Sequence, residues 1–76
     1  MPTILYRINP VQNMRRFYGL DVQPDLFGQW CLVREWGRIG RAGRVVTATY
    51  ESREEATRNL GRVQSVKFKR GYVPIR

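Results

Sequence analysis

The amino-acid sequence predicts an α+β domain in which one α-helix packs on an antiparallel sheet of four to five strands. Three observations predict this class. Apolar and polar residues alternate with a period of two over most of residues 4–51. Turn-forming residues interrupt the alternation at short intervals, and from Ser52 onward the apolar period becomes that of a helix. The chain has 76 residues, so we expect one domain spanning residues 1–76.

Four strands are expected in the first two thirds of the chain: residues 4–9, 14–22, 29–36 and 44–51. The first should end at Asn9 and Pro10, because proline cannot donate a hydrogen bond within a ladder. Turn chemistry separates the second strand from the third over residues 23–28. Gly40 and Gly43 predict a hairpin turn between the third strand and the fourth, which is rich in Val, Thr and Tyr.

A helix should begin at Ser52, because Ser52 followed by Glu55 has the spacing of a capping box. The expected apolar stripe consists of Ala56, Leu60 and Val63. Gly61 weakens a helix by about 1 kcal/mol relative to alanine, which predicts close packing on the sheet at that point. Gly71 should end the helix, and residues 72–75 are expected to form a short final strand.

The charge balance indicates an anionic partner. Fourteen basic residues against six acidic ones give a net charge of +8, and twelve of the fourteen are arginine. Arginine suits bidentate contacts with phosphate and stacking on bases. An anionic membrane is the competing partner, but no basic amphipathic helix with exposed aromatic residues is apparent. DNA is therefore the preferred partner, with RNA as a second candidate, and we expect a cytoplasmic or nucleoid-associated protein without a membrane segment.

The residue inventory argues against an enzyme. The chain has no histidine and a single cysteine, Cys31, which removes the commonest general base and metal ligand. Cys31 lies in an apolar run and is expected to be a buried structural thiol, with Trp30 beside it in the core. The glycines at 37, 40 and 43 match neither a dinucleotide-binding nor a phosphate-binding loop. We expect no cofactor, no metal and no small-molecule substrate.

The segment from Trp36 to Arg44 is the strongest candidate for a contact with nucleic acid. It combines an indole that can stack on a base or sugar, arginines that bind phosphate and glycines that allow close approach. Arg34 should share a face of its strand with Trp36. Basic residues near the helix end add to the charge. The predicted nucleic-acid-binding residues are Arg34, Trp36, Gly37, Arg38, Arg41, Arg44, Lys67, Lys69 and Arg70.

The tripeptide Trp36-Gly37-Arg38 and its neighbours resemble the WGR domain over nearly the whole chain. The other segments that carry the resemblance are Ile8-Asn9-Pro10, Asn13-Met14-Arg15-Arg16-Phe17-Tyr18, Leu26-Phe27-Gly28-Gln29-Trp30, Arg34-Glu35, Ile39-Gly40, Ser52 to Ala56 and Lys67 to Tyr72. The chain is most similar to small stand-alone bacterial WGR proteins. The resemblance implies that Trp36 stacks on a terminal nucleotide near a 5′ end and that Arg38 holds phosphate or a neighbouring protein domain.

Two hypotheses about function follow. The first is a non-enzymatic module that binds DNA ends, nicks or other breaks without reading sequence. In eukaryotic poly(ADP-ribose) polymerases, which the chain resembles through this domain, the module also relays break detection to a catalytic region. This chain has no such region, so any relay must act in trans. The second hypothesis is therefore a protein-interaction adaptor that docks on a separate repair or nucleotidyltransferase partner.

Overall fold

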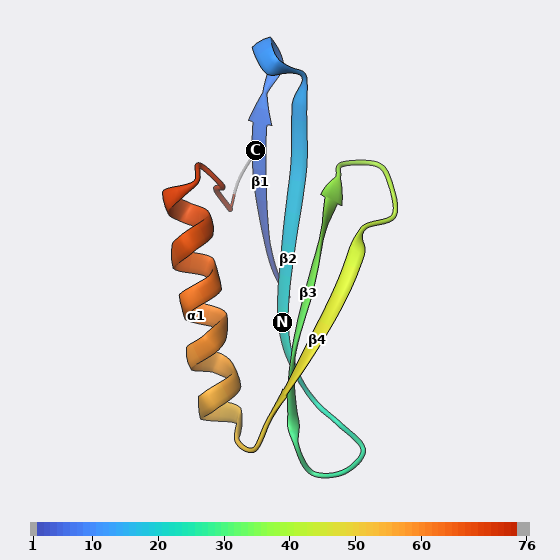
Figure 1. The fold of residues 1–76 in the computed structure, drawn as a ribbon, viewed down its shortest axis with the longest axis vertical. Helices are drawn as coiled ribbons and strands as arrows, with labels where there is room; N and C mark the ends of the chain where they lie inside the picture. Colours follow the sequence, from blue (N-terminus) through green and yellow to red (C-terminus); the bar gives the residue numbers. More distant parts are fainter. Residues whose placement is uncertain (1, 75–76) are drawn as a thin grey trace.

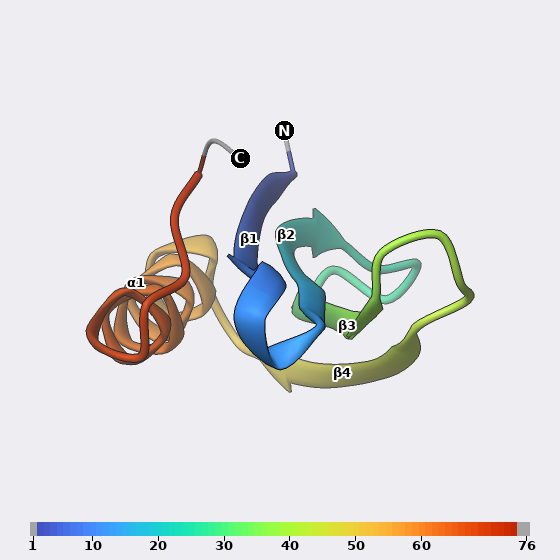
Figure 2. The ribbon, with the colours of Figure 1, turned by 90° about the horizontal axis from the view of Figure 1, so that it is seen from above.

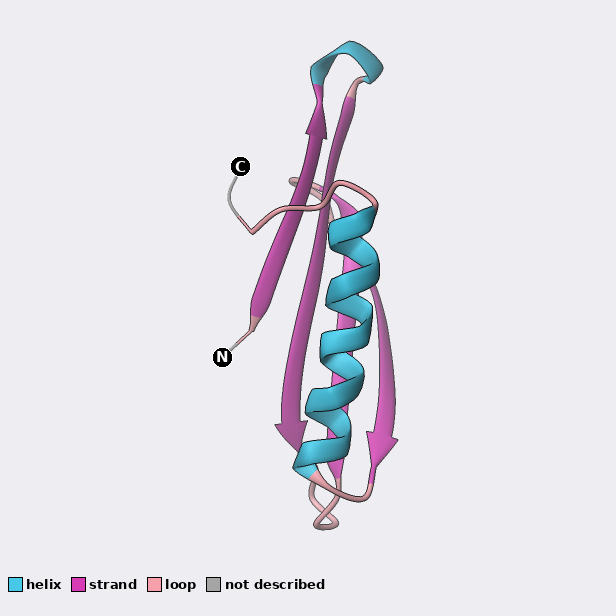
Figure 3. Ribbon diagram, turned by 90° about the vertical axis from the view of Figure 1, so that its left-hand side faces the viewer, coloured by secondary structure: helices cyan, strands magenta, loops and turns pink. Residues whose placement is uncertain are grey.

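The computed structural model describes residues 2–74 and has one helix packed on an antiparallel sheet, as the sequence predicts. The elements are β1 (Thr3–Asn9), the 3-10 helix η1 (Pro10–Gln12), β2 (Met14–Pro24), β3 (Trp30–Arg38), β4 (Arg44–Tyr50) and α1 (Arg53–Lys69). The strands follow one another in the order β1-β2-β3-β4, and α1 lies across one face of the twisted sheet (Figures 1 and 3).

The two turns that flank β2 are built by local side-chain hydrogen bonds. At the first turn, Asn9 accepts a hydrogen bond from the backbone of Gln12, and Asn13 takes the left-handed conformation with φ of 52°. At the second turn, one carboxylate oxygen of Asp25 accepts backbone hydrogen bonds from Phe27 and Gln29, both at 2.8 Å. β2 continues to Pro24, opposite Trp30, so this turn is shorter than expected.

Both ends of α1 have the caps that the sequence predicts. The Ser52 hydroxyl accepts a hydrogen bond from the Glu55 backbone at 3.1 Å. At the other end Gly71 is left-handed with φ of 92°. The backbone N–H groups of Gly71 and Tyr72 donate to the carbonyls of Phe68 and Lys67 at 3.1 and 3.0 Å. This is a Schellman motif, and it turns the chain back toward the sheet.

The expected final strand over residues 72–75 reduces to one bridge. The backbone of Val73 exchanges two hydrogen bonds with Tyr6 of β1, at 2.7 and 2.8 Å. Ile75 lies outside the described residues. Four strands therefore form within residues 2–74, and the segment after α1 is held against the free edge of β1 (Figure 2).

The hydrophobic core lies between α1 and the sheet. Its buried residues are Leu5, Tyr18, Leu20, Leu32, Ala56 and Tyr72. Residues that alternate along a strand share a face, so β1, β2 and β3 each direct their buried side chains toward α1. Leu60 and Val63 of the predicted stripe pack against this core.

The opposite face of the sheet is not covered by any helix or strand of the described chain. Ile4 and Val45 on this face are 43% and 57% exposed. Cys31 also points to it, is only half-buried and has its Sγ 3.9 Å from the Thr49 hydroxyl. The expectation of a buried Cys31 is therefore wrong, because odd-numbered residues of β3 face away from α1. Trp30 is likewise only partly buried, and the Arg53 guanidinium lies 5.6 Å from its ring centroid.

Two glycines differ from their sequence-based interpretation. A Cβ at Gly61 would meet nothing within 4 Å, so the expected close packing on the sheet is wrong, and Gly61 faces solvent. Gly43 was expected to shape the hairpin turn, but in the structure the surrounding groups leave no space for a side chain at this position. A Cβ there would lie 2.8 Å from both the Phe17 ring and the Trp36 carbonyl oxygen. Gly40 is the turn glycine, with φ of 90°.

Candidate nucleic-acid interface

Strand pairing gathers two aromatic and two basic side chains at one end of the sheet. Tyr18 of β2 pairs with Trp36 of β3, and Arg16 pairs with Arg38 in the same ladder. Because side chains two residues apart share a face, all four lie on the side of the sheet that α1 covers. α1 reaches this end of the sheet with its last turn, which carries Lys67.

Trp36 and Tyr18 form a stacked aromatic pair. Their ring centroids are 5.5 Å apart and their planes differ by 9°. Trp36 is half-buried and packs against the core, so only part of the indole is accessible to a ligand. The guanidinium groups of Arg34 and Arg44 lie 5.9 and 6.0 Å from the indole centroid. The exposed part of the indole is thus bordered by positive charge.

The end of α1 adds a lysine and a tyrosine to this aromatic pair. The Lys67 ammonium lies 4.4 Å from the centroid of Tyr18 and 5.5 Å from that of Tyr72. Tyr72 in turn meets Tyr18 edge to face, with centroids 6.2 Å apart. The Schellman motif after α1 brings Tyr72 to this position. The lysine charge is therefore held over two ring faces, which stabilise a cation.

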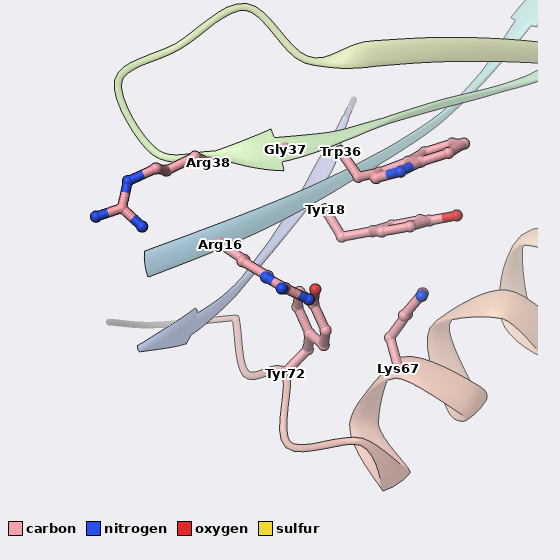
Figure 4. Close-up of a pocket in the computed structure, with 7 residues that line it drawn as sticks. All are labelled: Arg16, Tyr18, Trp36, Gly37, Arg38, Lys67 and Tyr72. Atoms are coloured by element: carbon pink, nitrogen blue, oxygen red, sulfur yellow. The ribbon is translucent and has the colours of Figure 1, made fainter. Parts of the chain in front are cut away.

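These side chains surround a cavity of about 490 Å³ (Figure 4). Its lining residues are Arg16, Tyr18, Trp36, Gly37, Arg38, Lys67 and Tyr72. Three of them are cations, three are aromatic and none is acidic. A cavity of this size accommodates a small organic ligand, and its lining offers phosphate-binding groups beside surfaces for stacking.

Arg38 lies at the end of the cavity away from Lys67 (Figure 4). Its guanidinium donates hydrogen bonds to the Asn13 backbone oxygen at 3.1 Å and to the Asn13 side-chain oxygen at 3.3 Å. The left-handed backbone of Asn13 presents both acceptors to Arg38. Because these two bonds use only part of the five-donor guanidinium, the group is oriented while donors remain for a ligand.

Lys67 has an unfavourable electrostatic environment for an ammonium group. Burial lowers its pKa below the usual 10.5, and the positive charges of Arg70 and Arg34 lower the pKa further. An anion placed near these three groups would oppose both effects.

The structure unites some of the predicted site residues and separates others. Trp36, Gly37, Arg38 and Lys67 line the cavity. Arg34 and Arg44 lie beside the indole, and Arg34 also lines a neighbouring hollow together with Arg70. Arg41 and Lys69 line neither space. Within the described part of the chain, no helix is long and apolar enough to cross a membrane, and no acidic, cysteine or histidine cluster could hold a metal ion.

Sequence reasoning missed Arg16, Tyr18 and Tyr72. A signal existed for the first two, because Arg16 and Tyr18 alternate on one face of their strand and could have been aligned with Trp36 and Arg38. No local signal marked Tyr72, because its position depends on the turn after α1 and on the bridge from Val73 to β1.

The fold and the cavity define a small α+β binding module with a basic, aromatic site at one end of its sheet. The chain belongs to the WGR domain family, which it matches over residues 1–76. In proteins of the poly(ADP-ribose) polymerase kind, this domain is a nucleic-acid-binding module. The chain is also 41% identical over 68 residues to an uncharacterized protein of Sinorhizobium fredii. That alignment covers 90% of this chain but 33% of the relative, so the chain spans about a third of the curated relative's length. No solved structure matches significantly.

Proposed function

We propose that this WGR domain is a non-enzymatic module that binds DNA and prefers ends, nicks and other breaks. The observation that carries the proposal is the cavity in which Arg16, Arg38 and Lys67 surround the Trp36–Tyr18 pair. Cations supply sequence-independent affinity for phosphate. An aromatic ring can stack on a base only where that base is unstacked or terminal.

The shape of the site supports a preference for interrupted DNA. Tyr18 stacks on one face of the indole, and the two rings extend from neighbouring strands, β2 and β3. An uninterrupted duplex offers phosphates to the surrounding cations but no unstacked base and no terminal sugar to the indole. A nick or an end offers both. The preference should therefore depend on Trp36, whereas exposed cations outside the cavity should contribute equally to every DNA.

Fluorescence anisotropy with three DNA ligands of equal length tests this proposal. A nicked duplex, a blunt duplex and a covalently closed circle are compared at two salt concentrations. The wild type should bind the nicked and blunt duplexes more tightly than the circle. Trp36→Ala should remove that preference, and Trp36→Phe, which retains a ring to pack on Tyr18, should weaken it. Thermal unfolding of each variant checks that the domain is folded.

Arg41→Ala is the matched control. Arg41 is exposed in the loop between β3 and β4 and lines neither the cavity nor the neighbouring hollow, so its loss should weaken all three ligands by the same factor. Equal weak binding of the wild type to the three DNAs would overturn the preference for breaks. An RNA duplex with a nick, bound as tightly as its DNA counterpart, would widen the ligand class to RNA.

The adaptor function has its own supporting observation, the face of the sheet that α1 leaves open, where apolar side chains lie beside Asp21 and Glu35. Ile4, Phe17 and Val33 line a shallow hollow there of about 210 Å³. A protein partner docked on this face could receive a signal from the opposite, basic face. A pull-down that survives nuclease treatment, combined with no measurable DNA affinity at low salt, would favour this second candidate over the first.

A further inference from the structure

A second basic hollow of about 320 Å³ adjoins the cavity already described, between the C-terminal half of α1 and β3. Its lining residues are Tyr18, Arg34, Arg62, Val63, Val66, Lys67 and Arg70. Four of them are cations and none is acidic. Tyr18 and Lys67 line both the cavity and this hollow, so Lys67 lies between the two.

The cations of this hollow converge from two elements. Arg62, Val66 and Arg70 are spaced four residues apart and form one row along α1. Arg34 comes from β3, two residues before Trp36, and therefore lies on the same side of the sheet as the indole. Val63 and Val66 supply the apolar part of the lining. The arrangement is a groove with positive charge on both sides.

The clustering of these charges is unfavourable without an anion. Arg34 and Arg70 both act on Lys67 by repulsion. Within residues 2–74, no carboxylate forms an ion pair with Arg62, Lys67 or Arg70. Like charges gathered without counter-charges destabilise a fold, and a bound phosphate would relieve the repulsion.

We propose that this hollow is a second phosphate site, which takes the phosphate next to that of the nucleotide held at Trp36, on the same strand. The inference rests on the proposed function, because it presumes a nucleotide in the first cavity. The shared Lys67 favours two phosphates that are neighbours along one backbone. The recognised unit is then a dinucleotide carrying two phosphates, with Lys67 between them.

Three small ligands distinguish the contribution of the second phosphate to the affinity from the contribution of the second base. Thymidine 5′-monophosphate has one phosphate and one base. The dinucleotide TpT has one phosphate and two bases, and pTpT has two of each. Titration of the isotope-labelled whole chain, followed by NMR, measures the three affinities. We expect pTpT to bind about tenfold more tightly than either of the others, as one added charge-assisted contact supplies.

The double variant Arg62→Gln/Arg70→Gln tests which residues supply that gain. Glutamine is as good a helix former as arginine, and both arginines are exposed, so the fold should persist. The variant should reduce the advantage of pTpT over TpT to less than about twofold. Arg58→Gln is the matched control, because Arg58 lies on the same helix and lines neither the cavity nor the hollow. It should behave as the wild type.

Two results would overturn the second site: an advantage of pTpT that survives in the double variant, or a wild type in which pTpT gains nothing over TpT. The failure of the proposed function has a different signature, which is the absence of preferential binding to the nicked duplex. If that preference is present while pTpT gains nothing, only the second site is refuted.

Discussion

Gly43 lies where the chain enters β4, and its replacement by alanine should destabilise the domain through overpacking. The added Cβ would lie 2.8 Å from the Phe17 ring, 2.8 Å from the Trp36 carbonyl oxygen and 3.0 Å from the Glu35 side chain. The side chains of Phe17 and Glu35 can shift. The Trp36 carbonyl cannot, because moving it moves β3 and with it one wall of the cavity.

The size of the effect follows from this geometry. Overpacking at a site that cannot relax costs about 1–3 kcal/mol, and we expect about 2 kcal/mol for Gly43→Ala because one of its overlaps is with backbone. A domain of this size has a urea dependence of about 1 kcal/mol per M. The midpoint of urea unfolding should therefore fall by about 2 M. Affinity for nicked DNA should fall as well, because Trp36 would be displaced.

Gly61→Ala is the matched control, with the opposite sign. It adds the same methyl group where nothing lies within 4 Å, in the interior of α1. Alanine favours a helix over glycine by about 1 kcal/mol, so the midpoint should rise by about 1 M while DNA affinity is unchanged. A Gly43→Ala midpoint equal to that of the wild type would refute the reasoning, as would a Gly61→Ala variant that is less stable.

Three further predictions concern the site and the helix. Asn13→Gly keeps the left-handed backbone but removes one hydrogen-bond acceptor from Arg38. The affinity for nicked duplex, measured by anisotropy, should therefore fall a few-fold. An unchanged affinity would contradict the role of Asn13 in orienting Arg38. Lys67→Met should weaken DNA binding without lowering the free energy of unfolding. Because the folded-state pKa of Lys67 is lowered, the unfolded chain holds this proton more tightly, so the contribution of Lys67 to stability rises as pH approaches 10.5. If the wild type is less stable than Lys67→Met, urea unfolding should show this difference in free energy shrinking as the pH rises toward 10.5. A difference that grows with pH would contradict the expected direction of the pH dependence. Ser52→Ala should lower the free energy of unfolding by about 1 kcal/mol through loss of the cap and leave DNA affinity unchanged, because Ser52 lies at the end of α1 remote from the cavity.

Much of the fold could be predicted because its signals are local. Alternation identified the strands, and the Ser52 and Gly71 caps bounded the helix within a residue or two. The strand ends were less accurate. β2 runs on to Pro24 and β3 to Arg38, because pairing with a neighbouring strand extends a ladder past residues whose own preferences favour a turn.

The errors fell on residues whose role depends on what lies opposite them. Close packing was expected at Gly61, which faces solvent, whereas it occurs at Gly43, which is closed in by Phe17 and the backbone of Trp36. Cys31 lies in an apolar run but points to the face that α1 leaves open. Neither burial nor close approach can be read from neighbours along the chain.

By itself, the sequence determined the α+β class, the order of the strands and helix and the excess of arginine, and it indicated Trp36 and Arg38 as candidate contacts. These properties depend on composition, on local periodicity and on motifs within a few residues. Only the tertiary structure decided which cations share a site. Arg16 and Tyr18 reach Trp36 through strand register, and Lys67 and Tyr72 reach it through the turn that ends α1. These contacts join residues far apart in the chain, so their strength depends on distances that exist only after folding.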